Sequence, residues 1–237
     1  MVEIIENIAP NLWAYRARFM QSCKETFLLF LIPGLISFAL GLLLGVVLTV
    51  TRKDGIKPNK VVFRIVDIFI NVFRAIPFVI LLIFLIPFTR AIVHTAIGVK
   101  GAIIPLVFGT VPFFSRQVET VLVNVAPGKI EAARSMGSSS IGIVFRVYLH
   151  EAVPELVRVT TITAISLIGL TTMAGAVGAG GIGSFAINYG QGQHHQDIVN
   201  VCVVVLLVAV CILQAIGSFL AKRTTNKSLF HKERANK

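Results

Sequence analysis

Two short patterns in the sequence have the residue types of known ligand sites. Gly178 to Gly183 reads GAGGIG, which matches the GxGxxG fingerprint of dinucleotide-binding proteins, and Asp197 follows roughly 20 residues later. The fingerprint works only where a strand turns into a helix, whereas these glycines follow an apolar run of bilayer length. The adjacent His194 and His195 lack a third metal ligand at helical spacing. We therefore expect a glycine-rich extracytoplasmic loop here, either flexible or closely packed, with no cofactor-binding site and no metal site.

The sequence also lacks the arrangements that hydrolytic enzymes use. No GxxxxGK[ST] pattern occurs, and Gly128-Lys129 is followed by Ile130 without the upstream glycine. No set of Ser, His and Asp residues and no pair of carboxylates has the spacing of a catalytic site. We expect no catalytic residue, and we do not expect the chain to be an enzyme or to bind ATP by itself.

A polar stripe interrupts one of the apolar blocks. Asp67, Asn71 and Arg74 have the spacing i, i+4, i+7, and on a helix they form one stripe together with Arg64. A charge at the centre of a bilayer costs roughly 2.5 to 3.5 kcal/mol, so the stripe should face protein or lie near the interface. Two interpretations stay open, a coupling or pathway site and a structural polar seam between helices.

A charged segment begins at Glu131, in a chain otherwise poor in charge. Pro127 suits the first turn of a short helix, and we expect Glu131 in that turn, where a carboxylate favours the helix dipole. Ala132 and Ala133 place only small side chains on one side of this helix. Gly137 should end the helix in a left-handed or tight turn.

A second short helix should follow this glycine. Three consecutive serines, at positions 138–140, can each cap it. Its apolar residues have the spacing i, i+3, i+4, i+7 and define one face: Ile141, Val144, Phe145 and Tyr148. Two short helices that meet at a glycine form a compact projecting knob that could enter a groove of another protein. An ordinary amphipathic surface helix would explain the same pattern.

The composition indicates an all-α integral membrane protein. Of the 237 residues, 55% are hydrophobic and 14% are charged, and the mean hydropathy is +0.84. A helix needs about 20 apolar residues to cross a bilayer core ~30 Å thick. We expect an N-terminal segment (1–25), a membrane domain (26–221) and a frayed basic tail (222–237). The apolar blocks predict about five spans, at 26–50, 65–88, 101–121, 157–176 and 198–221.

The distribution of basic residues predicts the orientation. The loop 52–64, the segment 116–158 and the tail together hold sixteen basic residues, against five in the N-terminal segment and the loop 90–100. Because cytoplasmic loops carry the excess of Lys and Arg, the C-terminus should be cytoplasmic and the N-terminus extracytoplasmic. This also explains the formal net charge of +11, and we expect no nucleic-acid partner.

The segment that begins at Glu131 resembles a motif of a known family. EAARSMG followed by VYLHEAVPEL is similar to the EAA loop of ABC importer permeases, and Glu131, Ala132, Ala133, Gly137 and Leu149 match at the family spacing. Val147 replaces the family Ile, and His150 replaces the family Pro, which puts the turn after the second helix in question. NVFRAIPFVILLIFLIPFTR and MAGAVGAGGIG resemble the methionine-type branch of these permeases.

The resemblance implies a subunit of an ATP-driven importer in a bacterial cytoplasmic membrane. Such a permease works as a homodimer with two cytoplasmic ATPase subunits, which bind ATP and Mg, and with an external substrate-binding protein. The cytoplasmic coupling loop (127–150) would then contact the ATPase, with Ile141 part of the contact. The resemblance points to methionine or a related amino acid. A permease for another small solute and a membrane scaffold without transport remain the alternatives.

One residue is a candidate for the gate of the pathway. Met173 lies late in the fourth predicted span, beside Gly169, Ala174 and Gly175. Small residues let helices approach closely, and a flexible thioether can close the remaining gap. We expect Met173 near the narrowest part of a dimer pathway, although a core methionine would explain the same position.

Overall fold

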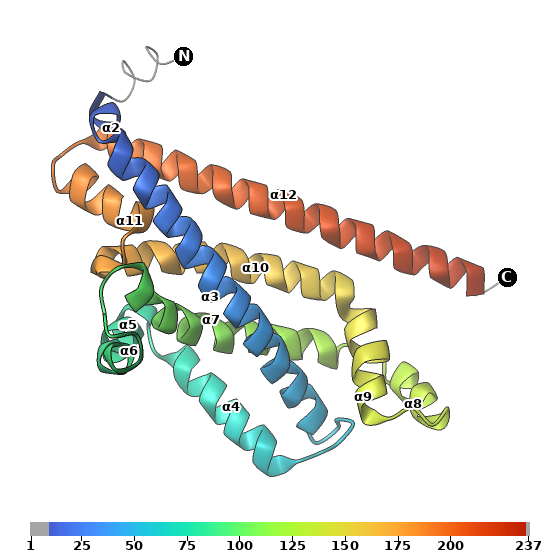
Figure 1. Ribbon diagram of the computed structural model, residues 1–237. Coiled ribbons are helices and arrows are strands. Elements are labelled where there is room, and N and C mark those ends of the chain that lie inside the picture. Colours follow the sequence, from blue (N-terminus) through green and yellow to red (C-terminus); the bar gives the residue numbers. More distant parts are fainter. Residues whose placement is uncertain (1–9, 236–237) are drawn as a thin grey trace. The chain divides into compact units, whose positions relative to one another are not determined.

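The computed structural model describes residues 10–235, and the side chains of residues 10–225. Within these residues the regular structure is entirely helical (Figure 1). Most helices are α-helices, and three short stretches (η1, η2 and η3) have the wider π-helical turn. The elements in chain order are α2 (Pro10–Ala14), α3 (Arg16–Thr51), α4 (Lys60–Ala75), α5 (Phe78–Phe84), α6 (Ile86–Val93), α7 (Gly98–Val123), α8 (Pro127–Ser135), α9 (Ser140–Ile143), η1 (Val144–Leu149), α10 (His150–Ala174), η2 (Gly175–Ala179), α11 (Gly181–Phe185), η3 (Ala186–Gln191) and α12 (Gln196–Ala235).

Four helical stretches are long and apolar enough to cross a membrane. They are Arg16–Thr51, Gly98–Val123, Ser140–Ala179 and Gln196–Thr225, and α4 with α5 passes the same test as a bent pair. The count of four to five spans confirms an all-α membrane protein with about five transmembrane helices. Half of the most apolar window of α7 is buried within the chain, against 11% for α12. Helix α12 therefore leaves most of its apolar surface to lipid or to another protein.

The second predicted span is wrong as a single helix. The chain bends by 106° between α4 and α5. Pro77, at the break, has an extended backbone (φ −56°, ψ 135°). A proline disfavours the helical conformation of the residue before it, which explains why α4 ends at Ala75. A further short helix, α6, begins at Ile86. The sequence 65–88 has the apolar length of a span, but the prolines divide it.

The helices at the two ends of the chain are longer than expected. Helix α3 begins at Arg16, so it includes ten residues of the predicted N-terminal segment. Helix α12 continues to Ala235 through a tail that we expected to be frayed. Neither extension contains a glycine or a proline that would stop a helix. Residues 1–9 of the N-terminal segment lie outside the described residues.

The chain forms two compact units, and each long helix contributes one end to each unit. Unit 1 consists of Met1–Ile36, Ile76–Thr110 and Ala164–Ile212, and unit 2 consists of Ser37–Ala75, Val111–Thr163 and Leu213–Lys237. The core of unit 1 has two clusters, one around Leu29, Leu106 and Leu167 and one around Phe185, Ile198 and Cys202.

In unit 2, helix α3 packs closely on α7. A Cβ atom at Gly45 would lie 2.6 Å from two side-chain atoms of Val118 and 2.8 Å from the carbonyl oxygen of Ser115. Only glycine allows this approach. The core of unit 2 continues from Phe114 and Val118 to Ile143 and Tyr148. It therefore joins the end of α7 to the segment α8–η1.

Candidate functional site

Helix α8 is the first half of the predicted knob. Pro127 occupies its first turn, as the sequence predicts. Ala133 is buried, whereas Glu131 and Ala132 are exposed. Glu131 is the fifth residue of α8 and therefore lies beyond the first turn. The first turn of α8 contains no acidic residue. The expected interaction of Glu131 with the helix dipole is wrong, because that effect falls off within one turn.

Gly137 makes the turn between the two short helices. Its φ is +75°, in the left-handed region. Its N–H donates to the carbonyl oxygen of Arg134 (2.9 Å), and the N–H of Ser138 donates to that of Ala133 (3.0 Å). These two bonds are the Schellman pattern of a glycine-terminated helix. A Cβ atom at this position would meet nothing within 4 Å. The turn therefore requires glycine for its backbone conformation, and the space beside it is open.

The second half of the knob starts with a serine cap. Ser139 is the N-cap of α9, and its hydroxyl accepts a hydrogen bond from the N–H of Gly142 (3.2 Å). The helix then continues through η1 into α10. His150 has helical angles (φ −65°, ψ −47°). The replacement of the family proline therefore leaves the helix unbroken. Figure 1 shows a change of direction between α9 and α10, close to the π-helical turn and Pro154.

The predicted apolar face of this second helix is divided in the structure. Tyr148 is buried, together with Ile143, which the predicted face did not include. Ile141 and Phe145 are 73% and 65% exposed, and Met136 on the turn is 78% exposed. The wider π-helical turn changes the register, so that residues of one predicted face point to different sides. Met136, Ile141 and Phe145 are exposed large apolar side chains of the knob, and we call them together the knob surface.

The knob is held on its other side. Ala133, Ile143 and Tyr148 belong to the core of unit 2, and Leu149 packs against that core, half-buried. Lys129 forms an ion pair with Glu151 at the start of α10. These contacts fix the base of the knob and leave the knob surface unpartnered among the described residues.

The knob also contacts the loop between α3 and α4. The Arg134 guanidinium donates hydrogen bonds to the carbonyl oxygens of Ile56 (3.0 Å) and Gly55 (3.4 Å). Two backbone acceptors are thereby paired with one charged donor. Sequence reasoning missed this role of Arg134.

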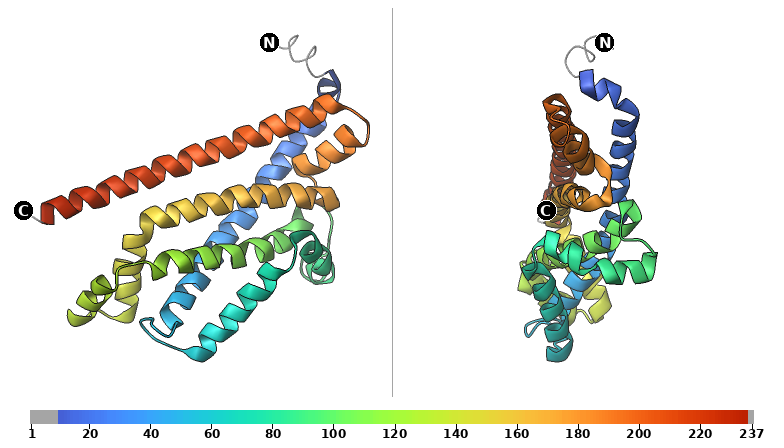
Figure 2. Two further views of the ribbon diagram at one scale, coloured as in Figure 1. Left: turned by 180° about the vertical axis from the view of Figure 1, so that it is seen from behind. Right: turned by 90° about the vertical axis from the view of Figure 1, so that its left-hand side faces the viewer.

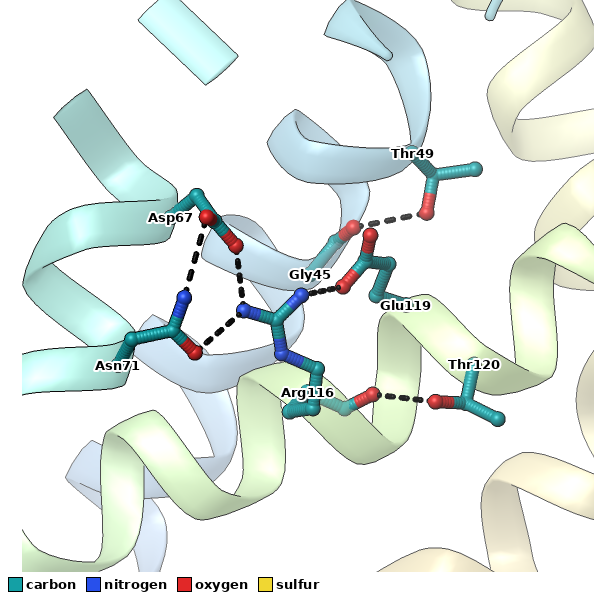
Figure 3. A network of polar contacts seen from close by, with 7 residues as sticks. All are labelled: Gly45, Thr49, Asp67, Asn71, Arg116, Glu119 and Thr120. Carbon is teal, nitrogen blue, oxygen red and sulfur yellow. Dashed lines mark hydrogen bonds and ion pairs between the residues drawn. The ribbon is translucent and has the colours of Figure 1, made fainter. Parts of the chain in front are cut away.

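A second group of polar residues joins α4 to α7 within unit 2 (Figure 3). Arg116 contacts Asp67 and Glu119, each at 2.5 Å, and its guanidinium also donates to the Asn71 side-chain oxygen (3.0 Å). The Asn71 amide donates in turn to Asp67 (3.1 Å). Glu119 is only 8% exposed. One guanidinium thus satisfies two carboxylates and an amide that would otherwise be costly to place in an apolar environment.

Half of the predicted polar stripe belongs to this network. Asp67 and Asn71 lie in a seam between helices, as the structural interpretation predicts. Arg74 and Arg64 are exposed and take no part in the seam. Sequence reasoning missed Arg116 and Glu119. Their opposite charges at i, i+3 inside an apolar helix could have identified them.

The glycine-rich segment is folded, contrary to the expected loop. After α10 the chain passes through η2 and returns as α11 and η3. Gly178, Gly180 and Gly181 have φ values of +94°, +84° and +77°, which produce the reversal. Their backbone conformation breaks the helix, as the composition predicts, but the chain then resumes a helix instead of remaining irregular.

Helix α3 holds the start of α11. The Glu25 carboxylate accepts a hydrogen bond from the N–H of Gly181 (2.8 Å), and the Thr26 hydroxyl accepts one from that of Ile182 (2.7 Å). These side chains satisfy N–H groups that a helix start leaves without partners. In the same unit, Asp197 accepts two hydrogen bonds from Asn11, each at 3.1 Å. The GAGGIG sequence is therefore occupied by contacts within the chain.

Met173 lies at the end of α10, just before the reversal. Its side chain is 50% exposed, whereas Ala174 and Gly175 are buried. A core position for Met173 within one chain is therefore wrong. Among the described residues, no group of three or more His, Cys, Asp or Glu side chains could hold a metal ion.

The sequence matches one family of membrane proteins. A family model described as "Binding-protein-dependent transport system inner membrane component" matches residues 37–226. The chain belongs to this family and is a multi-pass permease of a bacterial inner membrane.

Individual relatives support the same assignment. The chain is 40% identical to a probable D-methionine transport system permease protein, MetI, of Vibrio cholerae, over 86% of this chain and 90% of the relative. It is 41% identical to the methionine import system permease protein MetP of Bacillus subtilis, over 73% and 78% of the two chains. A chain in an inward-facing crystal form of the MetNI methionine ABC transporter superposes with a TM-score of 0.85 at 40% identity, covering 91% of this chain and 98% of that one.

Proposed function

We propose that this chain is the permease subunit of a methionine importer. Two copies would form the pathway, two ATPase subunits would bind on the cytoplasmic side, and an external binding protein would deliver the amino acid. The observation that carries the proposal is the knob surface, which is apolar, exposed and mounted on a fixed base. The methionine transport activity of the relatives supports the choice of substrate.

The knob surface has the properties of a docking site. Met136, Ile141 and Phe145 are each at least 65% exposed, and large apolar side chains gain most when a partner covers them. Their backbone is fixed by the Gly137 turn, the Ser139 cap and the core beneath. A partner that moves this surface would move the start of α10, because the helix continues from Ser140. Closure of an ATPase dimer would thereby act on the pathway.

Two features support a dimer of this chain. Helix α12 buries only 11% of its most apolar window within the chain. Met173 is half-exposed at the end of a span, where a second copy would face it. A flexible thioether at that place is suited to close a narrow pathway between two copies. Glu131, Ala132, Ala133, Gly137, Ile141 and Leu149 would remain the coupling residues, with Ile141 in direct contact.

Copurification with the ATPase tests the coupling role. Ile141→Ser removes an apolar side chain that is 73% exposed on the knob, and Ile97→Ser is a matched control that is 70% exposed on the loop between α6 and α7. We expect Ile141→Ser to reach the membrane normally and to lose most of the bound ATPase. Ile97→Ser should retain the ATPase. Equal ATPase recovery with both variants would reject the knob surface as the contact.

Uptake measurements test the substrate separately. Proteoliposomes with the whole complex should accumulate labelled methionine only with ATP and the binding protein present. An excess of unlabelled leucine or histidine should not compete. A complex that holds its ATPase but transports a different solute would leave the permease assignment intact and would overturn methionine. A chain that binds no ATPase would favour a scaffold.

A further inference from the structure

A hollow of about 890 Å³ lies in unit 2 between the end of α3 and the start of α4. Its lining includes four basic side chains, Arg52, Lys53, Lys60 and Arg64. Figures 1 and 2 show the chain turning back after α3, so that α4 runs in roughly the opposite direction to the last turns of α3. The lining belongs to the loop that the basic residues place in the cytoplasm.

The charge of this hollow is unbalanced. Two carboxylates, Asp54 and Asp67, also line it, but Asp67 is already paired with Arg116. Within the described side chains, none of the four basic groups has an ion pair or a side-chain hydrogen bond. Cations that are brought together without partners attract an anion.

The hollow borders an apolar surface of α4. Val61, Ile65, Ile68 and Val72 follow the spacing of one helix face and are 68%, 63%, 53% and 50% exposed. Such a face in a membrane protein is suited to acyl chains. Ile68 also lines the hollow, together with Phe63. A cationic hollow therefore lies directly beside an exposed apolar surface.

We propose that this hollow binds the phosphate headgroup of an anionic phospholipid of the cytoplasmic leaflet. The basic side chains would contact the phosphate, and the acyl chains would lie along the apolar face of α4. The adjoining apolar face favours a lipid over a free phosphate ion, which would gain nothing from it. Basic pockets between membrane helices on the cytoplasmic side have the chemistry that such headgroups need.

Retention of lipid by the purified transporter complex tests the site. We would measure phosphatidylglycerol and phosphatidylcholine bound to the complex by native mass spectrometry, for the unmodified protein and for Arg52→Gln/Arg64→Gln. Each basic residue near an anionic surface contributes about fivefold, so the pair should weaken phosphatidylglycerol binding about thirtyfold. The matched control is Lys222→Gln/Arg223→Gln, which removes two exposed basic residues from the other cytoplasmic end. It should retain the lipid.

The outcomes separate a site from a general attraction. Equal loss in both double variants, or equal retention of the two lipids, would overturn the proposal. Displacement of phosphatidylglycerol by millimolar inorganic phosphate would show a free-anion site instead. If Arg52→Gln/Arg64→Gln does not assemble, lipid can be added back to the delipidated unmodified complex and its thermal midpoint measured. Phosphatidylglycerol should raise its thermal midpoint more than phosphatidylcholine does, and an equal rise would reject the site.

Discussion

The knob and the glycine-rich segment are both short helical connections that reverse the chain at glycines with positive φ, but their surroundings are opposite. Nothing lies within 4 Å of a Cβ atom at Gly137. In the glycine-rich segment Gly178 is equally open, but a Cβ atom at Gly181 would lie 2.7 Å from the Thr26 hydroxyl oxygen. A Cβ atom at Gly183, within α11, would lie 2.4 Å from the carbonyl oxygen of Thr172. In one region glycine serves backbone conformation and leaves a surface free for a partner. In the other it serves close packing within the chain.

The largest effect is expected in the packed region. Gly183→Val would force a branched side chain against the backbone of Thr172, which cannot move aside cheaply. Overpacking of this kind costs roughly 3 kcal/mol, and we expect a strong fall in membrane abundance and in the thermal midpoint. Quantitative immunoblotting and thermal unfolding would measure both. Gly128→Val is a control, because a Cβ atom there meets nothing within 4 Å. Normal abundance of Gly183→Val would remove the contrast between the two regions.

A smaller loss of stability, with a larger loss of function, is expected at Gly137. Gly137→Val strains the left-handed backbone by about 1–2 kcal/mol but meets no neighbouring atom within its own chain. The variant should reach the membrane near its normal level and fail to hold the ATPase or to couple hydrolysis to transport. Gly137→Asn, which tolerates this conformation, should restore stability and weaken ATPase binding less. Wild-type abundance, ATPase recovery and uptake in the valine variant would mean that the knob is only a solvated surface.

The contact that holds α11 should give a modest effect. Glu25→Gln keeps an oxygen that can accept the N–H of Gly181 but loses the charge that strengthens this bond. We expect a loss of about 1 kcal/mol in thermal unfolding, with ATPase binding unchanged. Among the described side chains, the exposed control Glu155→Gln removes an acid that pairs only with its helical neighbour Arg158. It should change stability by less, because such exposed pairs contribute little. Loss of ATPase binding in Glu25→Gln would show that the two regions are not independent.

Met173 should have the smallest effect on stability. Its side chain is half-exposed, so Met173→Ala should leave abundance and thermal unfolding close to those of the unmodified protein. Uptake per ATP hydrolysed should change, because the gap in the pathway would close less well. The exposed Met20→Ala on α3 is the control for removal of a methionine. Unchanged transport together with unchanged basal hydrolysis would reject the gate.

The sequence predicts best the features that depend on local chemistry. Pro127, Gly137 and Ser139 act through backbone conformation and nearby hydrogen bonds, and their roles as helix start, turn and cap agree with the structure. The apolar blocks likewise predict the long helices. The apolar length of residues 65–88 does not reveal the break at Pro77, where the extended backbone ends the helix.

Features that depend on distant contacts could not be predicted in the same way. The return of the glycine-rich segment as α11 requires Glu25 and Thr26, which lie 156 residues away in the sequence. Tyr148 is buried whereas Ile141 and Phe145 are exposed, and this division depends on a π-helical turn that periodicity does not indicate. The seam of Asp67 with Arg116 joins α4 and α7, and only the residues on α4 form a polar stripe in the sequence.

That seam has a consequence for the order in which the protein is made. Asp67 is synthesised 49 residues before Arg116, its partner. Until α7 leaves the ribosome, α4 carries a carboxylate without a counter-charge, and a charge within the hydrocarbon is costly. Helix α4 should therefore settle in the membrane only after α7 arrives. A cysteine introduced on α4 should react with a water-soluble thiol reagent in nascent chains that stop before Arg116, and it should be protected in chains that extend beyond Val123.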